Sequence, residues 1–204
     1  MAETKFVSAG KPKAGGAIAT AAVGTTLPTD ATTEINKAFV NLGYISEDGL
    51  TNENTREAEN IKAWGGDVVA SLQSEKEDKF SYTLIEIANV DVLKEVFGQD
   101  NVAGDLESGI AVQVNAKELE ERSIVVDMIL NGGILKRIVI PNGKIVEMGE
   151  IVYKDDEVAG YEVTIQALPD STGNTHYEYL IKPGSTKSNS RTSITTTTSA
   201  TGGA

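Results

Sequence analysis

An alternation of apolar and polar residues dominates the middle of the chain and its C-terminal half. In the segment 79–87 (KFSYTLIEI), Phe80, Tyr82 and Leu84 fall on one face of an extended backbone, and the residues between them fall on the other. Successive side chains of a β-strand point to opposite faces of the sheet. The pattern therefore predicts a strand that buries these three side chains.

The same pattern predicts further strands, at 123–130, 134–140, 144–153, 161–168 and 175–182. Asn131-Gly132-Gly133 separates the first two of these strands, and its residues tolerate the positive φ angles of a tight hairpin turn. Pro141-Asn142-Gly143 predicts a second turn, and the acidic stretch 154–160 predicts a third. Such short connections favour a mostly antiparallel sheet.

One segment has the periodicity of a helix. Asn89 can cap its N-terminus, Gly98 can end it, and Leu93, Val96 and Phe97 form an apolar stripe between them. The helix would have only about two turns, and a helix that short is marginal by itself. We therefore expect it to dock on the sheet.

The two ends of the chain differ in composition from the middle. Residues 1–30 are rich in Gly, Ala, Lys and Thr without a clear period, and residues 184–204 are rich in Ser, Thr and Gly. Segments of this composition bury too little apolar surface to hold themselves folded. We predict a flexible N-terminal arm over 1–30, a folded β domain over 31–183 and a disordered tail over 184–204. Deletion of the arm should then leave a folded domain.

A polar segment lies inside the predicted domain. From about Ser46 to Asn60 the chain carries acids, amides and threonines with almost nothing apolar, and the single tryptophan, Trp64, follows with Gly65 and Gly66. Ordering such a segment in isolation costs conformational entropy. We expect a long polar loop that a neighbouring molecule orders. Trp64 would lie at its root, either in the core of the domain or in a pocket of the neighbour.

Composition sets limits on the class of protein. The chain has 204 residues, of which 40% are apolar and 5% aromatic, and its net charge is −12. It can therefore form a core, although one with few aromatic residues. An acidic surface repels phosphate at short range, which argues against static binding of nucleic acid.

No catalytic, cofactor or metal site is predicted. The chain has no cysteine and a single histidine, His176, whose place in a strand favours a structural role. Triads and zinc sites therefore lack the residues that they need. The Gly-rich stretch 10–16 lacks the ending of a phosphate-binding loop, and in 48–59 Gly49 is misplaced for a calcium loop. We expect the many carboxylates to lie in solvated turns.

Membrane insertion and secretion are not indicated. No apolar run approaches the about 18 residues of a membrane span. The N-terminus lacks the apolar core of a signal peptide. The expectation is a protein made inside the cell.

Four blocks of sequence together resemble a known family. GYISEDGLT (43–51), IKAWGGD (61–67), LIEIANVDVLKEVFG (84–98) and the stretch 137–168 are similar, in their order and spacing, to the tail tube proteins, or major tail proteins, of long-tailed non-contractile phages. The resemblance extends from about Ala31 to Lys182. It implies an antiparallel β-sandwich or incomplete barrel with one short flanking helix, as in the tube protein of type VI secretion.

The resemblance also implies a function. Subunits of that family form hexameric rings, which stack into a hollow tube that first holds a tape-measure protein and then conducts double-stranded DNA. Tail-terminator and tail-tip proteins would bind the ends of the tube. The chain would be assembled in the host bacterial cytoplasm and become part of the virion.

In relatives, an N-terminal arm and a long loop become ordered against neighbouring rings. On this basis we assign candidate assembly residues in the arm and around the polar segment: Phe6, Leu27, Ser46, Asp48, Leu50, Asn52, Asn54, Arg56, Trp64, Gly65 and Gly66. Positively charged side chains in the wall of a tube would bind the phosphates of DNA and hold it there. An acidic wall would instead repel the phosphates and keep the DNA near the axis. Candidate lumenal acids are Asp127, Glu147 and Glu150.

One alternative is a decoration or binding module of the capsid or tail, with the Thr-rich tail as a flexible appendage. It explains the C-terminus but gives no role to the arm or the polar segment. A tube subunit should polymerise with itself, and a decoration protein should not.

Overall fold

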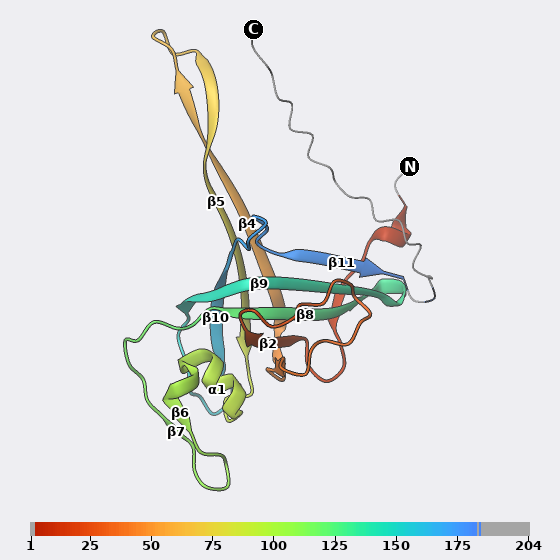
Figure 1. Ribbon diagram of the computed structural model, residues 1–204, viewed down its shortest axis with the longest axis vertical. Helices are drawn as coiled ribbons and strands as arrows, with labels where there is room; N and C mark the ends of the chain where they lie inside the picture. Colours follow the sequence, from red (N-terminus) through yellow and green to blue (C-terminus); the bar gives the residue numbers. More distant parts are fainter. Residues whose placement is uncertain (1–2, 183, 185–204) are drawn as a thin grey trace.

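The computed structural model describes residues 3–182 and 184 (Figure 1). Its helical segments are η1 (Thr4–Phe6), α1 (Val90–Phe97), η2 (Gln99–Asn101) and η3 (Asn131–Gly133). Its strands are β1 (Gly10–Pro12), β2 (Ile18–Ala22), β3 (Val40–Asn41), β4 (Ile45–Lys62), β5 (Val68–Leu84), β6 (Val102–Ala103), β7 (Ala111–Val112), β8 (Arg122–Leu130), β9 (Ile134–Met148), β10 (Tyr161–Leu168) and β11 (Tyr177–Ile181).

Among the described residues, nine strands form one open antiparallel sheet. Its order is β3-β2-β8-β9-β10-β5-β4; β1 pairs with the end of β8 that β2 leaves unpaired, and β11 with the part of β9 that β10 leaves unpaired. Strands β6 and β7 form a separate pair near α1. The prediction of a mainly β, antiparallel fold with one short helix is therefore confirmed.

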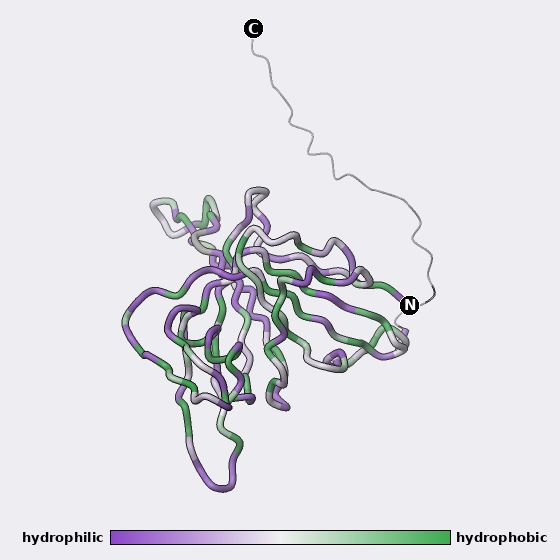
Figure 2. The backbone as a smooth tube through the Cα atoms, turned by 60° about the horizontal axis from the view of Figure 1, so that its bottom comes forward, coloured by the Kyte–Doolittle hydropathy of each residue, from purple (hydrophilic) through white to green (hydrophobic). Residues whose placement is uncertain are grey.

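The main core lies between the sheet and α1. Phe80, Tyr82 and Leu84 are buried there, as their alternation predicts, and Val92 and Val96 of α1 pack against them. Figure 2 shows the corresponding alternation of hydrophobic and hydrophilic residues along the strands. The face of β5 that the sequence assigns to the core is thus confirmed.

Strands β8 and β9 are buried on both faces. Ile124 and Ile140 belong to the main core, whereas Val125 and Val139 belong to a second cluster on the opposite face. Burial on two sides explains why both strands carry continuous apolar runs rather than an alternation.

The sheet begins before the expected domain boundary. Ile18 to Ala22 form β2, which pairs with β8, and Ile18 is 0% exposed. The prediction that residues 1–30 lie outside the folded part is therefore wrong. The small residues of β2 are packed between β8 and the segment that follows, so their low hydrophobicity does not prevent burial.

The predicted turn at residues 141–143 is also wrong, because β9 runs through it without a break. Ser123 donates a hydrogen bond from Oγ to the carbonyl oxygen of Pro141, at 2.7 Å. A Cβ at Gly143 would lie 2.8 Å from Cδ1 of Ile124 and 3.0 Å from Cγ2 of Ile165. The glycine therefore permits close packing within a strand.

Helix α1 is confirmed, and it begins and ends at the predicted capping residues. Asn89 caps it through Oδ1, which accepts a hydrogen bond from the amide of Asp91 at 3.0 Å. Gly98 follows the last residue with a φ of 103°. Glu95 is buried against the sheet, which the apolar stripe did not indicate.

The polar segment is a strand, not a loop. Residues 45–62 form β4, which pairs with β5 over most of its length. Backbone hydrogen bonds between β4 and β5 can form whatever the side chains are, so the pairing needs no apolar pattern. The expected loop at 46–60 is therefore replaced by one side of a long hairpin. The predicted C-terminal tail, apart from Gly184, lies outside the described residues.

Candidate assembly interface

The hairpin of β4 and β5 has a supported base and an unsupported outer part. Strand β10 pairs with β5 only from Lys79 to Leu84. Beyond that point β5 pairs with β4 alone, and Figure 1 shows the two strands projecting far from the rest of the molecule. Apart from its base at Asn52 and Asp78, the part of the hairpin over 52–78 is therefore an extension that the body does not cover; from here on we call this segment, and not the N-terminal residues, the arm.

The arm ends in an apolar tip. A turn over 63–67 joins the strands, with Gly65 and Gly66 at φ angles of 124° and 98° that favour glycine. Large apolar side chains around this turn are exposed, namely Ile61, Trp64, Val68, Val69 and Leu72. Most of the shaft between the tip and the body is polar instead.

Trp64 lies at the far end of the hairpin and not at its root. Its exposed fraction is 106%, so it makes no contact that shields it within its own chain. Both the expected position at the root and the alternative of a core tryptophan are wrong. An indole held in water at the end of an arm is the kind of side chain that a partner's pocket takes up.

A buried carboxylate fixes the base of the arm. Asp78 is 2% exposed and is the first residue of β5 beyond the pairing with β10. It accepts hydrogen bonds from Asn52 Nδ2 at 2.9 Å and Thr175 Oγ1 at 2.5 Å, and His176 Nδ1 lies 2.6 Å from it. Asp78 thus joins β4, β5 and the segment that enters β11, and we call these four residues the base cluster.

The base cluster favours an ionised Asp78. Burial opposes ionisation, but the hydrogen bonds from Thr175, Asn52 and His176 outweigh it and hold the pKa of Asp78 below its usual value. The ring of His176 also packs edge-on against Phe80, with 5.2 Å between the ring centroids. His176 lies directly before β11 and not in a strand as predicted, and its contacts with Asp78 and Phe80 are at the base of the arm.

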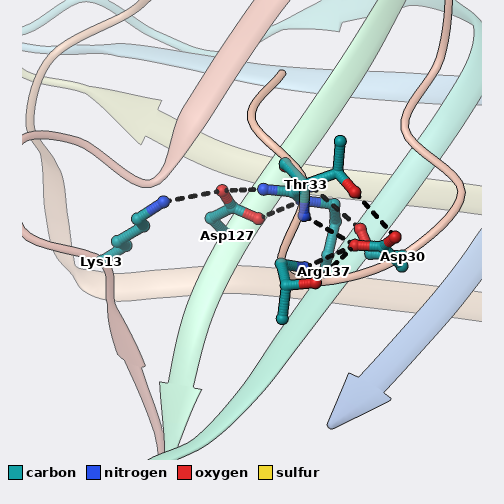
Figure 3. A network of polar contacts seen from close by, with 6 residues as sticks. Lys13, Asp30, Thr33, Asp127 and Arg137 are labelled. Atoms are coloured by element: carbon teal, nitrogen blue, oxygen red, sulfur yellow. Dashed lines mark hydrogen bonds and ion pairs between the residues drawn. The ribbon is translucent and has the colours of Figure 1, made fainter. Parts of the chain in front are cut away.

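A second polar network holds the N-terminal region on the sheet (Figure 3). Arg137, only 2% exposed, binds both carboxylate oxygens of Asp127 at 2.6 and 2.8 Å. It also donates to the carbonyl oxygens of Asp30 and Thr33, at 2.9 and 2.7 Å. Lys13 reaches Asp127 at 3.6 Å. The network ties the chain before β3 to β8 and β9.

This network changes the prediction for Asp127. Its charge is neutralised by Arg137 and Lys13, so it is not available to repel DNA. Glu147 and Glu150, in contrast, are exposed at the end of β9 and just after it. Of the three candidate lumenal acids, only these two present open carboxylates.

The other candidate assembly residues fall into two groups. Leu27 packs on the second cluster, Leu50 packs on the main core, and Asn52 belongs to the base cluster, so all three have roles within the chain. The remaining candidates lie on the surface or are partly exposed, with the side chain of Phe6 75% exposed: Phe6, Ser46, Asp48, Asn54 and Arg56.

Two of the hollows on the body differ sharply in polarity. One, of about 250 Å³, opens beside α1 and is lined mainly by apolar side chains, among them Phe97, Val114, Leu119, Val146 and Met148. We call it the helix hollow. The other, of about 510 Å³, contains six acids. Within the described residues, no group of three or more His, Cys, Asp or Glu side chains is placed to hold a metal ion.

The carboxyl group of Glu95 is buried between α1 and the sheet. Burial raises the pKa of Glu95, against the opposing effects of Arg122 and Thr20. Arg122 Nε lies 3.4 Å from Glu95 Oε2, and Thr20 Oγ1 donates to Oε1 at 3.2 Å. The contact joins α1 to β8 and β2, so it fixes the helix that borders the helix hollow.

An open antiparallel sheet that carries one short α-helix and a long hairpin with an exposed apolar tip defines a mainly β protein. A family model described as "Phage tail tube protein" matches residues 10–190, and the chain therefore belongs to the phage tail tube protein family. This is a family of structural proteins, not of enzymes, and its members are components of the virion tail. None of the described helices is long and apolar enough to cross a membrane.

Other comparisons add little to this assignment. No curated protein matches the sequence. The chain is similar to a solved structure of the tube-terminating cap of the anti-feeding prophage, with 6% identity, a TM-score of 0.45, and coverage of 80% of this chain and 88% of the other. It is also similar to a chain of an extracellular contractile injection system, from a sheath–tube complex in the extended state, with 6% identity, a TM-score of 0.42, and coverage of 84% and 93%. Both TM-scores are below 0.5, so the assignment depends on the family model.

Proposed function

We propose that the chain is the tube subunit of a long-tailed, non-contractile phage, and that it forms hexameric rings that stack into a hollow tube. The arm is the observation that carries this proposal. It pairs with nothing but itself, ends in an exposed apolar tip, and belongs to a member of the tail tube protein family. An exposed apolar patch of this kind is typical of a contact surface.

The assembly needs two separate interfaces. Within the described residues, strands β3 and β11 each pair on one side only, so each would leave an edge open for a neighbouring copy. Pairing of such edges around a ring would remove them from solvent. The arm extends away from these edges and would make the contact between rings, because a contact repeated along an axis builds a filament.

The proposed role as a tube subunit implies several binding partners. The chain would bind copies of itself, surround a tape-measure protein, and meet tail-terminator and tail-tip proteins at the two ends. Assembly would take place in the host bacterial cytoplasm. No cofactor is needed for any of these steps.

The tube would conduct double-stranded DNA without binding it. The net charge of −12 supports this proposal, since few cations would be available to hold phosphates. Glu150 is the exposed acid that we propose for the lumen, since Glu147 also lines the helix hollow. At physiological salt its repulsion would extend about 8 Å, which is enough to keep DNA off the wall.

Sedimentation velocity at rising protein concentration tests self-assembly. We expect large species to appear for the natural chain, and to be lost in Trp64→Ser, because the apolar tip is weakened. Val158→Ser is the matched control, because the side chain of Val158 is also exposed, at 72%, but lies on the body and not on the arm. A chain that stays monomeric at all concentrations, and also in the presence of the tail-tip complex, would favour a decoration protein instead.

A further inference from the structure

The tip and the helix hollow have matching properties. The tip exposes an indole and four aliphatic side chains, and the hollow is a concave site of about 250 Å³ with mostly apolar walls. Val114, Val146 and Met148 in its wall are themselves exposed, so the hollow also presents uncovered apolar surface. Burial of an aromatic side chain in such a pocket is typical of the centre of a protein interface. The thioether of Met148 adds a group that aromatic rings contact favourably.

Charge distinguishes the helix hollow from the acidic one. Residues 52–78 of the arm contain seven acids and three bases, a net charge of −4. The larger hollow is lined by six acids and no base, so it would repel the arm. The helix hollow has one charge of each sign, Lys117 and Glu147, and the tip has Lys62 and Asp67. Docking of the tip in the helix hollow would therefore involve no net electrostatic repulsion.

The positions of the two surfaces exclude a contact within one chain. Figure 1 shows the tip at one end of the long axis and α1 near the other end. A contact between different surfaces at opposite ends is head-to-tail, and such a contact repeats along an axis instead of closing into a pair. The occupant of the hollow is therefore a second copy of this chain.

We propose that the apolar tip of each subunit, with Trp64 at its centre, inserts into the helix hollow of the next subunit along the tube. The proposal rests on the proposed function and specifies its contact between rings. Helix α1 is thereby the receptor element, and the Glu95–Arg122 contact positions it on the sheet.

Trp64 itself reports on this contact, because it is the only tryptophan in the chain. In the monomer its emission should be that of an indole in water, and an aqueous quencher should reach it fully. In assembled protein we expect emission at shorter wavelength and protection from the quencher. Emission that stays unchanged in tubes seen by electron microscopy would overturn the proposal and leave the tube function standing.

The absence of cysteine allows the receptor to be tested directly. Ala63→Cys keeps Trp64, and Val146→Cys places a second thiol in the helix hollow. A short bis-maleimide should convert assembled double variant into a ladder of covalent multimers on a denaturing gel. Ala63→Cys with Val158→Cys is the matched control, because Val158 lines the acidic hollow; it should remain monomeric on the gel.

The outcomes separate the two proposals. Tubes without a ladder from the first pair, or with a ladder from the control pair, would overturn the assignment of the helix hollow but not the tube. A natural chain that forms no tubes, even with the tail-tip complex, would overturn both. If the double variant alone fails to assemble, the emission of Trp64 in natural tubes decides.

Discussion

At the scale of single residues, Asp78 determines how the arm leaves the body. It is the first residue that β10 no longer supports, and it receives hydrogen bonds from two other segments of the chain. A hydrogen bond to a charged, buried acceptor contributes more to stability than one between neutral groups. The base cluster should therefore stabilise the body and orient the arm together.

We predict that Asp78→Asn lowers the free energy of unfolding by about 2 kcal/mol, because a buried amide cannot accept all of these hydrogen bonds. Urea unfolding at neutral pH measures the change. Asp67→Asn, in the exposed turn of the tip, is the control and should have almost no effect. Equal stabilities of the two variants would contradict a role of Asp78 in stability.

The difference in stability between the natural chain and Asp78→Asn should depend on pH. Since the hydrogen bonds of Asp78 hold its pKa in the folded chain below that in the unfolded chain, its ionised form stabilises the fold at any pH above the unfolded pKa. As pH falls through the folded pKa, this stabilisation is lost. We expect the natural chain and Asp78→Asn to differ most near neutral pH and to converge in acid, as measured by urea unfolding at each pH.

At the scale of secondary-structure elements, the sequence predicts some strands well and misses others for clear reasons. The strand containing Phe80 and Tyr82 alternates because one of its faces is buried, so its pattern is visible. Beyond Leu50, strand β4 is largely exposed on both faces and has no apolar period, although it pairs with β5 over most of its length. The Gly65-Gly66 pair beside Asp67 is the local turn signal that could have located the tip.

Contacts between distant residues could not be predicted at all. Asp78 and His176 are 98 positions apart, and neither lies in a pattern that indicates the other. The Arg137–Asp127 pair joins neighbouring strands, but the carbonyl groups that Arg137 also binds come from the chain before β3. Such sites depend on how the sheet folds, so only the structure reveals them.

The arm should be dispensable for folding. Its residues pair only with each other, so replacing Thr55–Glu77 by an Asn-Gly turn between Asn54 and Asp78 should leave the melting temperature of the body nearly unchanged. The shortened chain should no longer form large species. Circular dichroism and sedimentation velocity measure the two effects, and a body that unfolds would show that the arm is part of the core.

The residues before β1 should be dispensable for folding, whereas β2 should be required for it. Deletion of residues 1–9 should leave a folded chain, because these residues precede β1 and are mostly exposed where described. Deletion of 1–30 should abolish cooperative thermal unfolding, because it removes β2 and its buried Ile18 from the sheet. Thermal unfolding of both truncated chains distinguishes these cases. A folded domain after the longer deletion would contradict the role of β2.

At the scale of the whole molecule, shape and charge would serve different steps of the proposed function. The long axis, with the tip and α1 near its two ends, would suit the proposed stacking of subunits. The acidic surface would suit the proposed passage of DNA. A change of charge away from the contact surfaces should thus alter passage without altering assembly.

Reversal of Glu150 to Lys tests this separation, since Glu150 is exposed and outside the helix hollow. We expect tubes of normal length and slower release of DNA from virions, because each added cation can hold a phosphate. Time-resolved fluorescence of released DNA measures the rate. Glu107→Lys, on the exposed connection between β6 and β7, is the control. Unchanged release in Glu150→Lys would contradict a lumenal position.

Electron microscopy of the purified chain tests the central claim most directly. The protein is concentrated, with and without the tail-tip complex, and imaged in negative stain. We predict hollow tubes of constant diameter with a regular axial repeat, and none from the chain with the shortened arm. Discrete particles from the natural chain under both conditions would contradict its assignment as a self-assembling tube subunit.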